Sequence, residues 1–344
     1  MRIGLLLSGG VDSLMSAYLL QQAGHEVVGF TMHNWSPQVL ESASEAAAWL
    51  HIEHNLVDLR EEFSQQVVDY FVSAYAEGST PNPCVLCNAK IKFGALLSAA
   101  LALGCDKVAS GHYARVRFNE ERGLYELYRG LDRRKDQSYF LCRLQQEQLR
   151  RLVFPLGEWE KSRVQTEALA LGMPAARAPE SQEICFIDGD YRDFLRTRLA
   201  AVSGTVYSLD GKELGKHRGL PFYTRGQRKG LGISAGEPLY VVRLDVRQNR
   251  VILGKNRDLM TKRAYAAQPA FLEAVDWREP RAVRAQVRYR SPAAPAQVRQ
   301  LDDGILQIDF QSAQRAVTPG QTIAFYDGDR LLGGAILQES PDFL

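Results

Sequence analysis

The first residues that could carry chemistry form a Gly- and Ser-rich turn near the start of the chain. The stretch LLLSGGVDSLMSAYLL occupies Leu5–Leu20. Ile3–Leu7 predicts a buried strand, and the apolar spacing after Ser13 predicts a helix. Gly9 and Gly10 permit backbone conformations that other residues resist. The backbone N–H groups of such a turn, at the positive end of a helix, could bind an anion such as phosphate.

This turn differs from two common phosphate-binding sequences. The chain contains no G-x-x-x-x-G-K-[ST] P-loop, and the turn is not G-x-G-x-x-G. A tight turn that binds nothing remains the simplest alternative. However, the hexapeptide SGGVDS resembles the pyrophosphate loop of the ATP-pyrophosphatase superfamily, whose members cleave ATP to AMP and pyrophosphate. The resemblance implies that ATP, with Mg²⁺, binds at Leu6, Leu7, Ser8, Gly9, Gly10, Val11, Asp12 and Ser13.

A second stretch, GSTPNPCVLCNAKIKFG at residues 78–94, holds a C-x-x-C pair. Its prolines predict an irregular loop, and a helix is expected to begin near Asn88. Cys87 would then lie at a helix N-terminus with Lys90 and Lys92 in the next turn, a setting that favours the nucleophilic thiolate. From the residues alone, Cys84 and Cys87 could be a redox pair, half of a zinc site, or a chance pairing.

A third stretch, PESQEICFIDGDYRDFL at residues 179–195, contains another cysteine. Cys185 lies between Ile and Phe, so its own context predicts a buried core cysteine. Cys105 and Cys142 also have apolar neighbours, and we assign them no chemistry. Five cysteines, an odd number, argue against a disulfide framework and fit a reducing compartment.

The first 200 residues alternate between strand and helix patterns, which predicts an α/β fold with a doubly wound parallel sheet. Ligands of such a sheet bind at the carboxyl ends of its strands. The expected strands after the first are Glu26–Met32, Asn55–Asp58 and Asp106–Ser110, and the expected helices are Val39–His51, Glu61–Tyr75 and Ala89–Leu103.

The pattern changes near Gly204 to short Val- and Ile-rich runs of period two, which predict two small all-β domains. We expect domains at 1–202, 203–263 and 264–344, the first catalytic and the others binding RNA. Residues 201–300 carry 19 Lys and Arg against 8 Asp and Glu, a net charge of +11. This excess favours a nucleic-acid partner, although a solvated basic surface without a partner has the same composition.

The overall composition is that of an ordinary globular protein. The 344 residues are 45% hydrophobic and 24% charged. No apolar run approaches the ~20 residues of a membrane span, and no signal peptide precedes the first strand. We therefore expect a cytoplasmic protein without a membrane partner.

Several linked motifs in a fixed order resemble those of the bacterial and mitochondrial tRNA-specific 2-thiouridylases. This family uses ATP and a persulfide sulfur to convert the wobble uridine of certain tRNAs into 2-thiouridine. The resemblance implies an adenine nucleotide alpha hydrolase-like fold for the parallel sheet. Besides the pyrophosphate loop, the motifs are TPNPCVLCNAKIKF, SGHYARV, KDQSYFL, SQEICFI, YTRGQRKGLGI, VRYR and PGQTIAFYDGD.

The resemblance implies a role for each matching residue. Cys185 would receive sulfur as a persulfide, and Cys87 would help to release it or close a disulfide with Cys185 afterwards. Met32 and Gly111 would contact the nucleotide. The implied partners are the anticodon arm of tRNA and a persulfide sulfur donor or carrier protein. The residues expected on the tRNA side are Asn82, Pro83, Cys84, His112, Lys135, Asp136, Gln137, Arg288, Tyr289 and Gln321.

The chain departs from the family pattern in two places. The usual loop reads N-P-D, but Cys84 replaces the aspartate. Cys84, Cys87 and Cys185 could then converge on a [4Fe–4S] cluster whose free iron carries sulfide, or on a zinc ion, or Cys84 could be a passive replacement. The segment after Met32–Trp35 also lacks the cysteine- and aspartate-containing insert expected there.

Two other classes of function compete with this interpretation. A small-molecule AMP-forming ligase would use the pyrophosphate loop but would leave Cys87 and Cys185 without a role. A non-catalytic RNA-binding adaptor would use the basic region but would leave the pyrophosphate loop unexplained. Release of AMP and pyrophosphate only in the presence of tRNA distinguishes thiolation from both.

Overall fold

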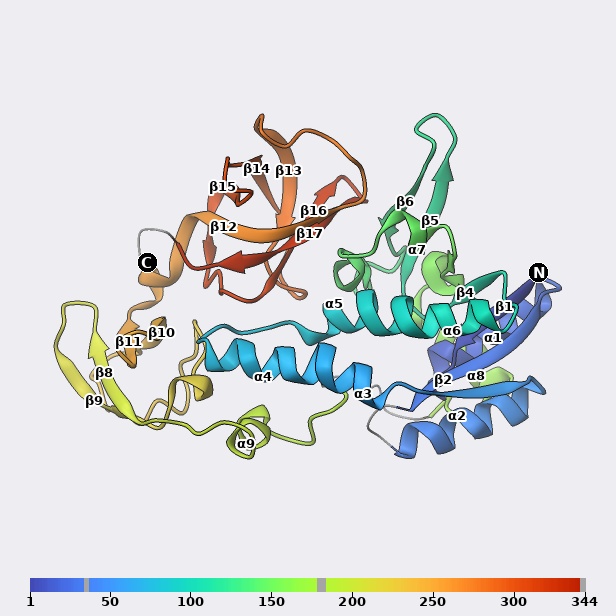
Figure 1. The fold of residues 1–344 in the computed structure, drawn as a ribbon, viewed down its shortest axis with the longest axis horizontal. Helices are drawn as coiled ribbons and strands as arrows, with labels where there is room; N and C mark the ends of the chain where they lie inside the picture. The colour runs from blue at the N-terminus through green and yellow to red at the C-terminus, as the bar shows by residue number, and fades with distance from the viewer. Residues whose placement is uncertain (34–36, 178–183, 341–344) are drawn as a thin grey trace.

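The structure is a computed structural model that describes residues 1–33, 37–177 and 184–340. Within these residues the strands form three sheets, which belong to a parallel α/β region, a small β region and a β-barrel (Figure 1). Parts of two quoted motifs, residues 34–35 and 181–183, lie outside the described residues.

The parallel sheet belongs to the first 160 residues and confirms the predicted doubly wound fold. Its strand order is β3-β2-β1-β4-β7, and every neighbouring pair is parallel. The order changes direction between β1 and β4, which is where open α/β sheets bind ligands. The strands are β1 (Arg2–Leu6), β2 (Glu26–His33), β3 (His54–Asp58), β4 (Lys107–Ala109) and β7 (Leu152–Val153).

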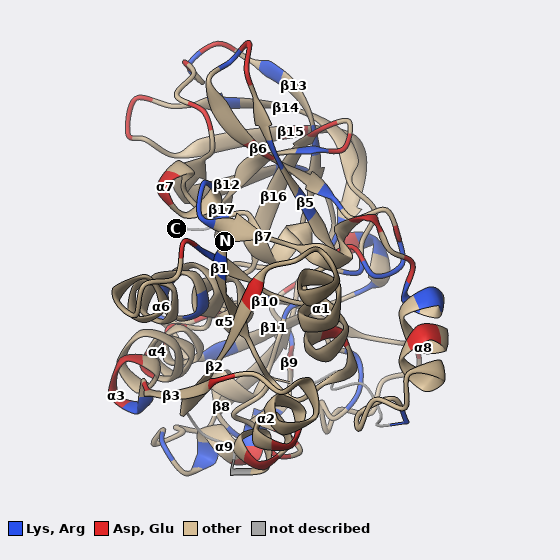
Figure 2. Cartoon of the chain, turned by 90° about the vertical axis from the view of Figure 1, so that its right-hand side faces the viewer, with Lys and Arg blue, Asp and Glu red and all other residues tan. Residues whose placement is uncertain are grey.

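Helices cover both faces of this sheet, as Figure 2 shows. On one face, Leu14, Ala46 and Val164 contribute to a buried cluster from α1 (Val11–Gln22), α2 (Pro37–Leu50) and α8 (Lys161–Ala170). On the other, the cluster draws on α3 (Arg60–Phe63), η1 (Ser64–Val68), α4 (Asp69–Ala76), α5 (Pro83–Cys87), η2 (Asn88–Leu96) and α6 (Leu97–Ala102). Shorter helical turns are η3 (Ser138–Leu141), α7 (Gln146–Leu149), η4 (Pro155–Glu158) and α9 (Tyr191–Arg196).

The helix that carries the C-x-x-C pair starts earlier than the sequence predicts. It begins at Pro83, not near Asn88, and runs without interruption to Ala102. Pro83 occupies the first helical position, where its fixed φ and missing N–H are favourable. Cys87 therefore lies beyond the first turn, and the prediction that it sits at the helix N-terminus is wrong.

This same helix, Pro83–Ala102, is long and apolar enough to cross a membrane by length and composition alone. The expectation that no segment approaches that length is therefore wrong. However, 44% of its apolar window is buried inside the protein, where Ile91 and Phe93 are fully enclosed. Its apolar composition is explained by packing against the parallel sheet.

The small β region contains a mixed four-stranded sheet of order β10-β11-β8-β9. The central pair, β11 and β8, is parallel, and the outer pairs are antiparallel. Val206, Val241 and Val251 are fully buried in it. The elements are β8 (Gly204–Ser208), β9 (Glu213–His217), η5 (Leu220–Phe222), β10 (Tyr240–Asp245), β11 (Arg250–Gly254) and η6 (Asn256–Leu259).

The last region is a closed antiparallel barrel. Its long first strand β12 (Met260–Phe271) pairs with both β15 (Leu306–Arg315) and β17 (Arg330–Gln338), which closes the sheet. Between them lie β13 (Arg281–Gln286), β14 (Ala294–Gln300) and β16 (Thr322–Asp327). The barrel encloses fully buried Val298, Ile308, Ile323 and Phe325. Two small all-β units are therefore confirmed.

A hairpin from the α/β region extends the barrel sheet. Its strands are β5 (Ala114–Asn119) and β6 (Leu124–Arg129), and β6 pairs with β17 of the barrel. Buried Glu126 accepts hydrogen bonds from Arg122 at 3.1 Å and Arg330 at 3.2 Å. This joint between distant parts of the chain is absent from the sequence-based predictions.

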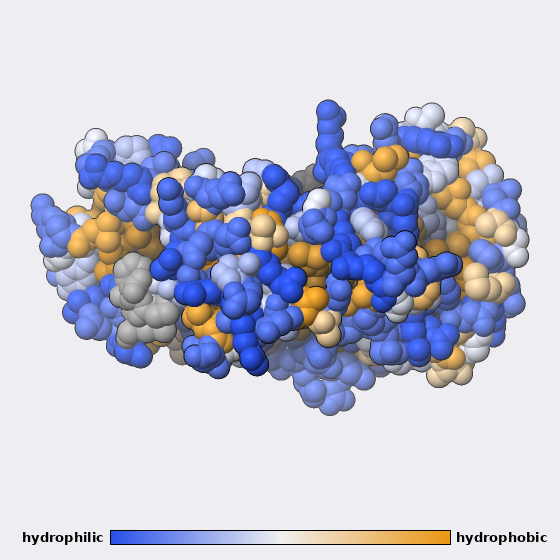
Figure 3. All heavy atoms as spheres, turned by 90° about the horizontal axis from the view of Figure 1, so that it is seen from above, coloured by the Kyte–Doolittle hydropathy of each residue, from blue (hydrophilic) through white to orange (hydrophobic). Residues whose placement is uncertain are grey.

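The surface is mostly polar. In the ribbon of Figure 2, basic and acidic residues are interspersed along the chain. Seen from above, apolar atoms lie in separate patches among hydrophilic ones (Figure 3).

Candidate active site

The pyrophosphate loop connects β1 to α1 at the carboxyl edge of the parallel sheet, and two glycines shape it. Gly9 has φ +77°, and a Cβ there would lie 2.4 Å from the backbone of Ser42 in α2. Gly111 follows β4, and a Cβ there would lie 2.9 Å from the backbone of Asp12. Both positions therefore require glycine, and Gly111 lies beside the loop. Its predicted contact with the nucleotide stays a prediction.

The polar groups of the loop suit an anion. Ser13 donates its hydroxyl to the carbonyl of Gly10 at 2.8 Å, and the Ser8 hydroxyl lies 3.3 Å from that of Ser13. Helix α1 begins directly after Gly10 without a side-chain cap. Within the described chain, the N–H groups of Gly9 and Gly10 donate to no backbone carbonyl. These donors at a helix N-terminus fit phosphate groups.

Asp12 has two partners that the sequence analysis missed. Lys161 donates to both carboxylate oxygens, at 2.7 and 2.8 Å, and the Tyr113 hydroxyl donates to one of them at 2.8 Å. Lys161 is only 9% exposed, so this ion pair is sheltered from water. The 149 residues between the partners leave no local signal in the sequence. Lys161 adds a cation beside a loop suited to polyphosphate.

The other predicted nucleotide contacts lie on the neighbouring strands. Leu6 ends β1, and Leu7 donates its N–H to the carbonyl of Phe30 at 2.8 Å. Val11 opens helix α1. Met32, in β2, pairs with Val57 and is half-buried. These residues therefore surround the same edge of the sheet as the glycines.

Three cysteines share one electrostatic environment. Cys87 is 6% exposed, whereas Cys84 and Cys185 are exposed, so the prediction of a buried Cys185 is wrong. Burial raises the pKa of Cys87 to about 12, Lys92 opposes this shift, and both other thiols add to it. The pKa values of Cys84 and Cys185 are also raised by desolvation and lowered in part by Lys92. The predicted activated Cys87 thiolate is therefore not the resting state.

The residue after Cys185 packs into the core beside the parallel sheet. The ring of Phe186 makes edge contacts with Phe63 at 5.7 Å and with Phe71 at 5.4 Å. Phe186 and Cys87 belong to one buried cluster. The two cysteines, 98 positions apart in the sequence, influence each other electrostatically. Their approach as a reactive pair stays a prediction.

A π-helical segment, η2, places Lys92 in this environment. Its carbonyls depart from the α-helical pattern, and the Gln148 amide donates to those of Ala89 at 2.8 Å and Phe93 at 2.6 Å. With bonds from i to i+5, Lys92 lies one π turn after Cys87. Gln148 is a third residue that the sequence analysis missed.

His112 lies beside Lys92 and is neutral. Its Nδ1 is 2.8 Å from the Ser110 hydroxyl, and its ring lies between Phe93 and Phe154, at 5.6 and 5.8 Å. Burial, with a smaller effect of Lys92, lowers the pKa of His112 to about 3. An imidazole in this position can donate or accept a hydrogen bond but carries no charge near neutral pH.

The KDQ motif lies on the loop that joins the hairpin to η3. Asp136 is buried and accepts bonds from Arg129 at 2.6 Å and from the Gly130 N–H at 3.1 Å. Gln137 accepts the N–H of Tyr113 at 3.0 Å. Asp136 and Gln137 are thus engaged within the protein, whereas Lys135 is half-exposed.

In the barrel, Arg288 and Tyr289 also have internal contacts. Arg288 donates to the carbonyl of Arg315, and desolvation and Arg315 lower its pKa. The Tyr289 ring packs on Phe140 with centroids 4.4 Å apart. These residues join the barrel to the α/β region, and their predicted contact with tRNA stays a prediction.

Gln321 fixes the loop that precedes the cysteine helix. Its amide donates to the carbonyls of Thr80 at 2.9 Å and Pro81 at 3.2 Å, and Thr80 donates its N–H to Pro319 at 2.9 Å. Asn82 is the N-cap of α5. We call Pro319–Gln321 with Thr80 and Pro81 the barrel clamp. It holds the segment leading into Pro83 and Cys84.

No group of three His, Cys, Asp or Glu side chains among the described residues is arranged to hold a metal ion. Cys84, Cys87 and Cys185 influence one another but do not form such a ligand set. Their raised pKa values also disfavour the thiolates that bind metals.

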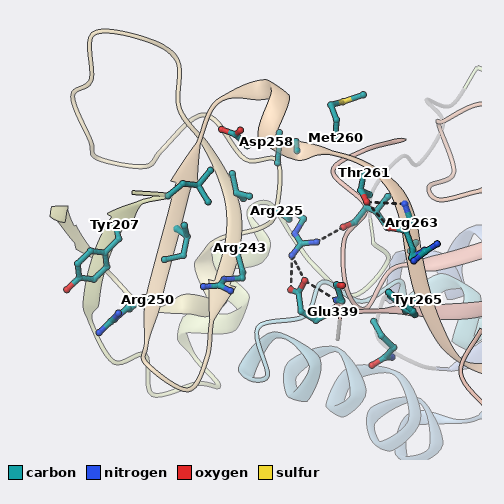
Figure 4. A pocket seen from close by; sticks show the side chains of 18 of the residues that line it. Tyr207, Arg225, Arg243, Arg250, Asp258, Met260, Thr261, Arg263, Tyr265 and Glu339 are labelled. Atoms are coloured by element: carbon teal, nitrogen blue, oxygen red, sulfur yellow. Dashed lines mark hydrogen bonds and ion pairs between the residues drawn. The ribbon is translucent and has the colours of Figure 1, made fainter. Parts of the chain in front are cut away.

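A separate groove of about 620 Å³ lies between the small β region and the barrel. Figure 4 shows the labelled arginines approaching it from both sides. Arg225 is bound to Glu339 through two 2.7 Å bonds, and Arg250 lies over the Tyr207 ring at 4.8 Å. Four arginines of the basic segment 201–300 thus line this groove.

Comparison with known proteins first gives the class of protein. The family model for the tRNA methyl transferase HUP domain matches residues 1–189. The model for the tRNA methyl transferase PRC-barrel domain matches 192–255, and that for the aminomethyltransferase beta-barrel domain matches 261–337. The chain therefore combines a HUP domain with two β-barrel modules.

The curated relatives then give the family. A tRNA-specific 2-thiouridylase MnmA from Syntrophomonas wolfei is 48% identical over 98% of this chain and 100% of its own length. One from Moorella thermoacetica is 44% identical over 96% of this chain and 98% of its own. The chain belongs to the tRNA-specific 2-thiouridylase MnmA family.

Among solved structures, a predicted tRNA methyltransferase subunit from Methanocaldococcus jannaschii matches at 17% identity and a TM-score of 0.33. It covers 49% of this chain and 76% of its own.

Proposed function

We propose that this protein is a tRNA-uridine 2-sulfurtransferase that thiolates the wobble uridine in an ATP-dependent reaction. The observation that carries the proposal is the union of two features in one domain. A pyrophosphate-type loop occupies the carboxyl edge of the parallel sheet. Lys92, on the helix that carries Cys87 and packs against that sheet, acts on the pKa of both Cys87 and Cys185. Membership in the family supports the same function.

The first step would activate the base. The C2 oxygen of uridine is a poor leaving group, and transfer of AMP from ATP to this oxygen makes it a good one. Ser8, Ser13 and the N–H groups of Gly9 and Gly10 would hold the departing pyrophosphate, and Lys161 would neutralise the Asp12 carboxylate beside it. Mg²⁺ would accompany ATP. The loop residues would therefore bind ATP, and the cysteines would carry out the sulfur transfer.

The second step would transfer sulfur. A persulfide on Cys185 attacks C2 with its terminal sulfur, and AMP leaves with the former C2 oxygen. Cys87 then attacks the Cys185 sulfur, which forms the Cys87–Cys185 disulfide and releases 2-thiouridine. Exposure of Cys185 gives a persulfide donor or carrier protein access to it, and Lys92 stabilises each thiolate as it forms.

The [4Fe–4S] route is the alternative for the same reaction. The three thiols are neighbours, but their arrangement provides no ligand set in the described residues. We therefore route no step through a cluster. Iron and acid-labile sulfide analysis of anaerobically purified protein tests this: thiolation by an iron-free protein would favour the persulfide route.

We propose a division of labour among domains 1–202, 203–263 and 264–344, with the β domains binding the anticodon arm. The support is the groove between them, where Arg243 and Arg250 provide positive charge for phosphates. The target base must leave its stack to reach the sheet edge, which costs a few kcal/mol. We expect this reaction to take place in the cytoplasm.

The decisive experiment replaces Cys185 by Ser. The variant should form no 2-thiouridine, because no persulfide can form, while still binding tRNA and releasing pyrophosphate from ATP in its presence. Cys105→Ala, a buried cysteine outside the site, is the matched control and should thiolate normally. Full thiolation by Cys185→Ser would refute the assignment. Pyrophosphate release without tRNA would instead favour a small-molecule ligase.

A further inference from the structure

The C-x-x-C helix carries one buried and one exposed cysteine, and the two-cysteine reaction uses only the buried one. Cys87 is buried at 6% exposure, while Cys84, three positions earlier on the same helix, is exposed. The Cα atoms of residues i and i+3 in a helix lie about 5 Å apart. That spacing is within the range of a disulfide bond. Cys185 is exposed as well, so an external reductant reaches Cys84 and Cys185 more readily than Cys87. Cys84 is also the thiol that lies three helical positions from Cys87, so it can attack the Cys87 sulfur from within the protein.

We propose that Cys84 is a resolving thiol that takes over the disulfide from Cys87–Cys185 and presents it to an external dithiol. This inference rests on the proposed persulfide reaction, which leaves that disulfide behind. The C-x-x-C pair thereby gains a role as an internal exchange couple in the sulfur-transfer cycle.

The exchange balances as follows. The Cys84 thiolate attacks the Cys87 sulfur, the Cys84–Cys87 bond forms, and Cys185 leaves as a thiolate that takes up the proton released by Cys84. Cys185 is then free to accept the next sulfur. An external dithiol attacks the exposed Cys84 sulfur, frees both cysteines as thiols and becomes a disulfide itself.

Two features of the structure suit this exchange. Lys92 acts to lower the pKa of all three thiols. The thiolate formed at each stage of the exchange is therefore stabilised by the same cation, whichever cysteine carries it. The helix start is held from outside the helix, because Asn82 makes no side-chain cap and Gln321 holds Thr80 and Pro81 instead. The first turn can then adjust to close the i, i+3 bond without losing a cap.

The test measures repeated turnover in the full chain. Wild type and Cys84→Ser are loaded with persulfide, given ATP and tRNA, and supplied with limiting dithiothreitol. The ratio of later turnovers to the first should fall roughly tenfold in Cys84→Ser, because a neighbouring thiol acts at millimolar effective concentration. Excess dithiothreitol should restore the ratio. Cys84→Asp should behave like Cys84→Ser, and Cys105→Ala like wild type.

Disulfide mapping by mass spectrometry gives the second measurement. After turnover without reductant, wild type should contain Cys84–Cys87, and Cys84→Ser should retain Cys87–Cys185. A wild-type end product of Cys87–Cys185 alone, or an unchanged turnover ratio in Cys84→Ser, would overturn the proposal.

A third measurement separates this proposal from the proposed function. The protein is equilibrated with reduced and oxidised dithiothreitol in the absence of ATP and tRNA. Cys84–Cys87 should be the main disulfide even if thiolation itself fails in the turnover assay. If thiolation succeeds and this disulfide is absent at equilibrium, the resolving role is wrong while the proposed function stands.

Discussion

The ionisation of Cys87 depends on a balance between burial and a single neighbouring lysine. Burial raises the pKa of Cys87 to about 12, and Lys92 acts in the opposite direction. At neutral pH the thiol form therefore dominates. Cys87 therefore remains an unreactive thiol until a bound substrate or a neighbouring disulfide promotes loss of its proton.

This balance predicts the pH dependence of Cys87 alkylation. Below the pKa, the thiolate fraction rises about tenfold per pH unit, so the rate of reaction with iodoacetamide should climb without a plateau from pH 7 to 10. Lys92→Met should lower the rate at each pH, and Lys92→Arg should largely preserve it. Lys90→Met, exposed on the same helix, is the control. Peptide mass spectrometry measures the rate, and a plateau below pH 9 would contradict the buried setting.

At the scale of elements, the π-helical segment η2 connects packing with the position of Lys92. Its Ala89 and Phe93 carbonyls receive the Gln148 amide, so a side chain from α7 supports the unusual backbone. The segment follows directly after Cys87. A change in its backbone would therefore move the cation relative to the thiols.

Gln148→Ala should lower the free energy of unfolding by about 1–3 kcal/mol, because two partly buried carbonyls lose their donor and the Gln145 N–H loses its acceptor at the start of α7. Urea denaturation measures this loss. Gln65→Ala removes an exposed amide bound only to Glu61 and should have little effect. The alkylation rate of Cys87 should also change in Gln148→Ala. An unaltered stability would show that the segment holds its geometry without the amide.

The elements also show which features the sequence could predict. The anion-binding turn and the parallel sheet follow from local spacing, because a strand, a glycine turn and a helix are adjacent in the chain. That the turn is a pyrophosphate loop is what the family resemblance implies. The helix start was misplaced because prolines also break helices, and Pro83 instead opens one. Apolar neighbours wrongly predicted a buried Cys185: Phe186 points inward while Cys185 remains exposed.

The contacts that the sequence could not predict join distant positions. Lys161 reaches Asp12 across 149 residues, and Gln321 reaches Thr80 across 241. Nothing in the local pattern around a lysine or glutamine distinguishes such a partner from a solvated side chain. The family resemblance marked Gln321 as important, but only the fold shows which atoms it contacts.

At the scale of the whole molecule, the barrel clamp connects the last domain to the cysteine helix. Gln321→Ala should reduce thiolation at saturating tRNA while tRNA affinity stays close to wild type, because the amide acts on Thr80 and Pro81. Proteolysis near residues 78–82 should become faster. Gln314→Ala, whose amide contacts only Ser312, is the control. A large loss of tRNA affinity with normal turnover would instead support a direct RNA contact.

The basic groove predicts a salt effect on tRNA binding. Each lost phosphate contact should reduce the slope of log affinity against log salt by about 0.7–0.9, so Arg243→Gln with Arg250→Gln should flatten it. Arg225 is a poorer candidate than its sequence motif predicts, because Glu339 already neutralises it. Arg163→Gln, exposed on α8, is the control. An unchanged slope would place the RNA elsewhere.

The barrel clamp also has a consequence for protein synthesis. The ribosome makes the cysteine helix early, but the residues that hold its entry, Pro319–Gln321, emerge more than 200 positions later. A nascent or truncated chain can thus fold its nucleotide loop long before its cysteine loop is fixed. Such a chain would lack an ordered thiol site, so the ability to transfer sulfur would arise only after the last barrel strands have been translated.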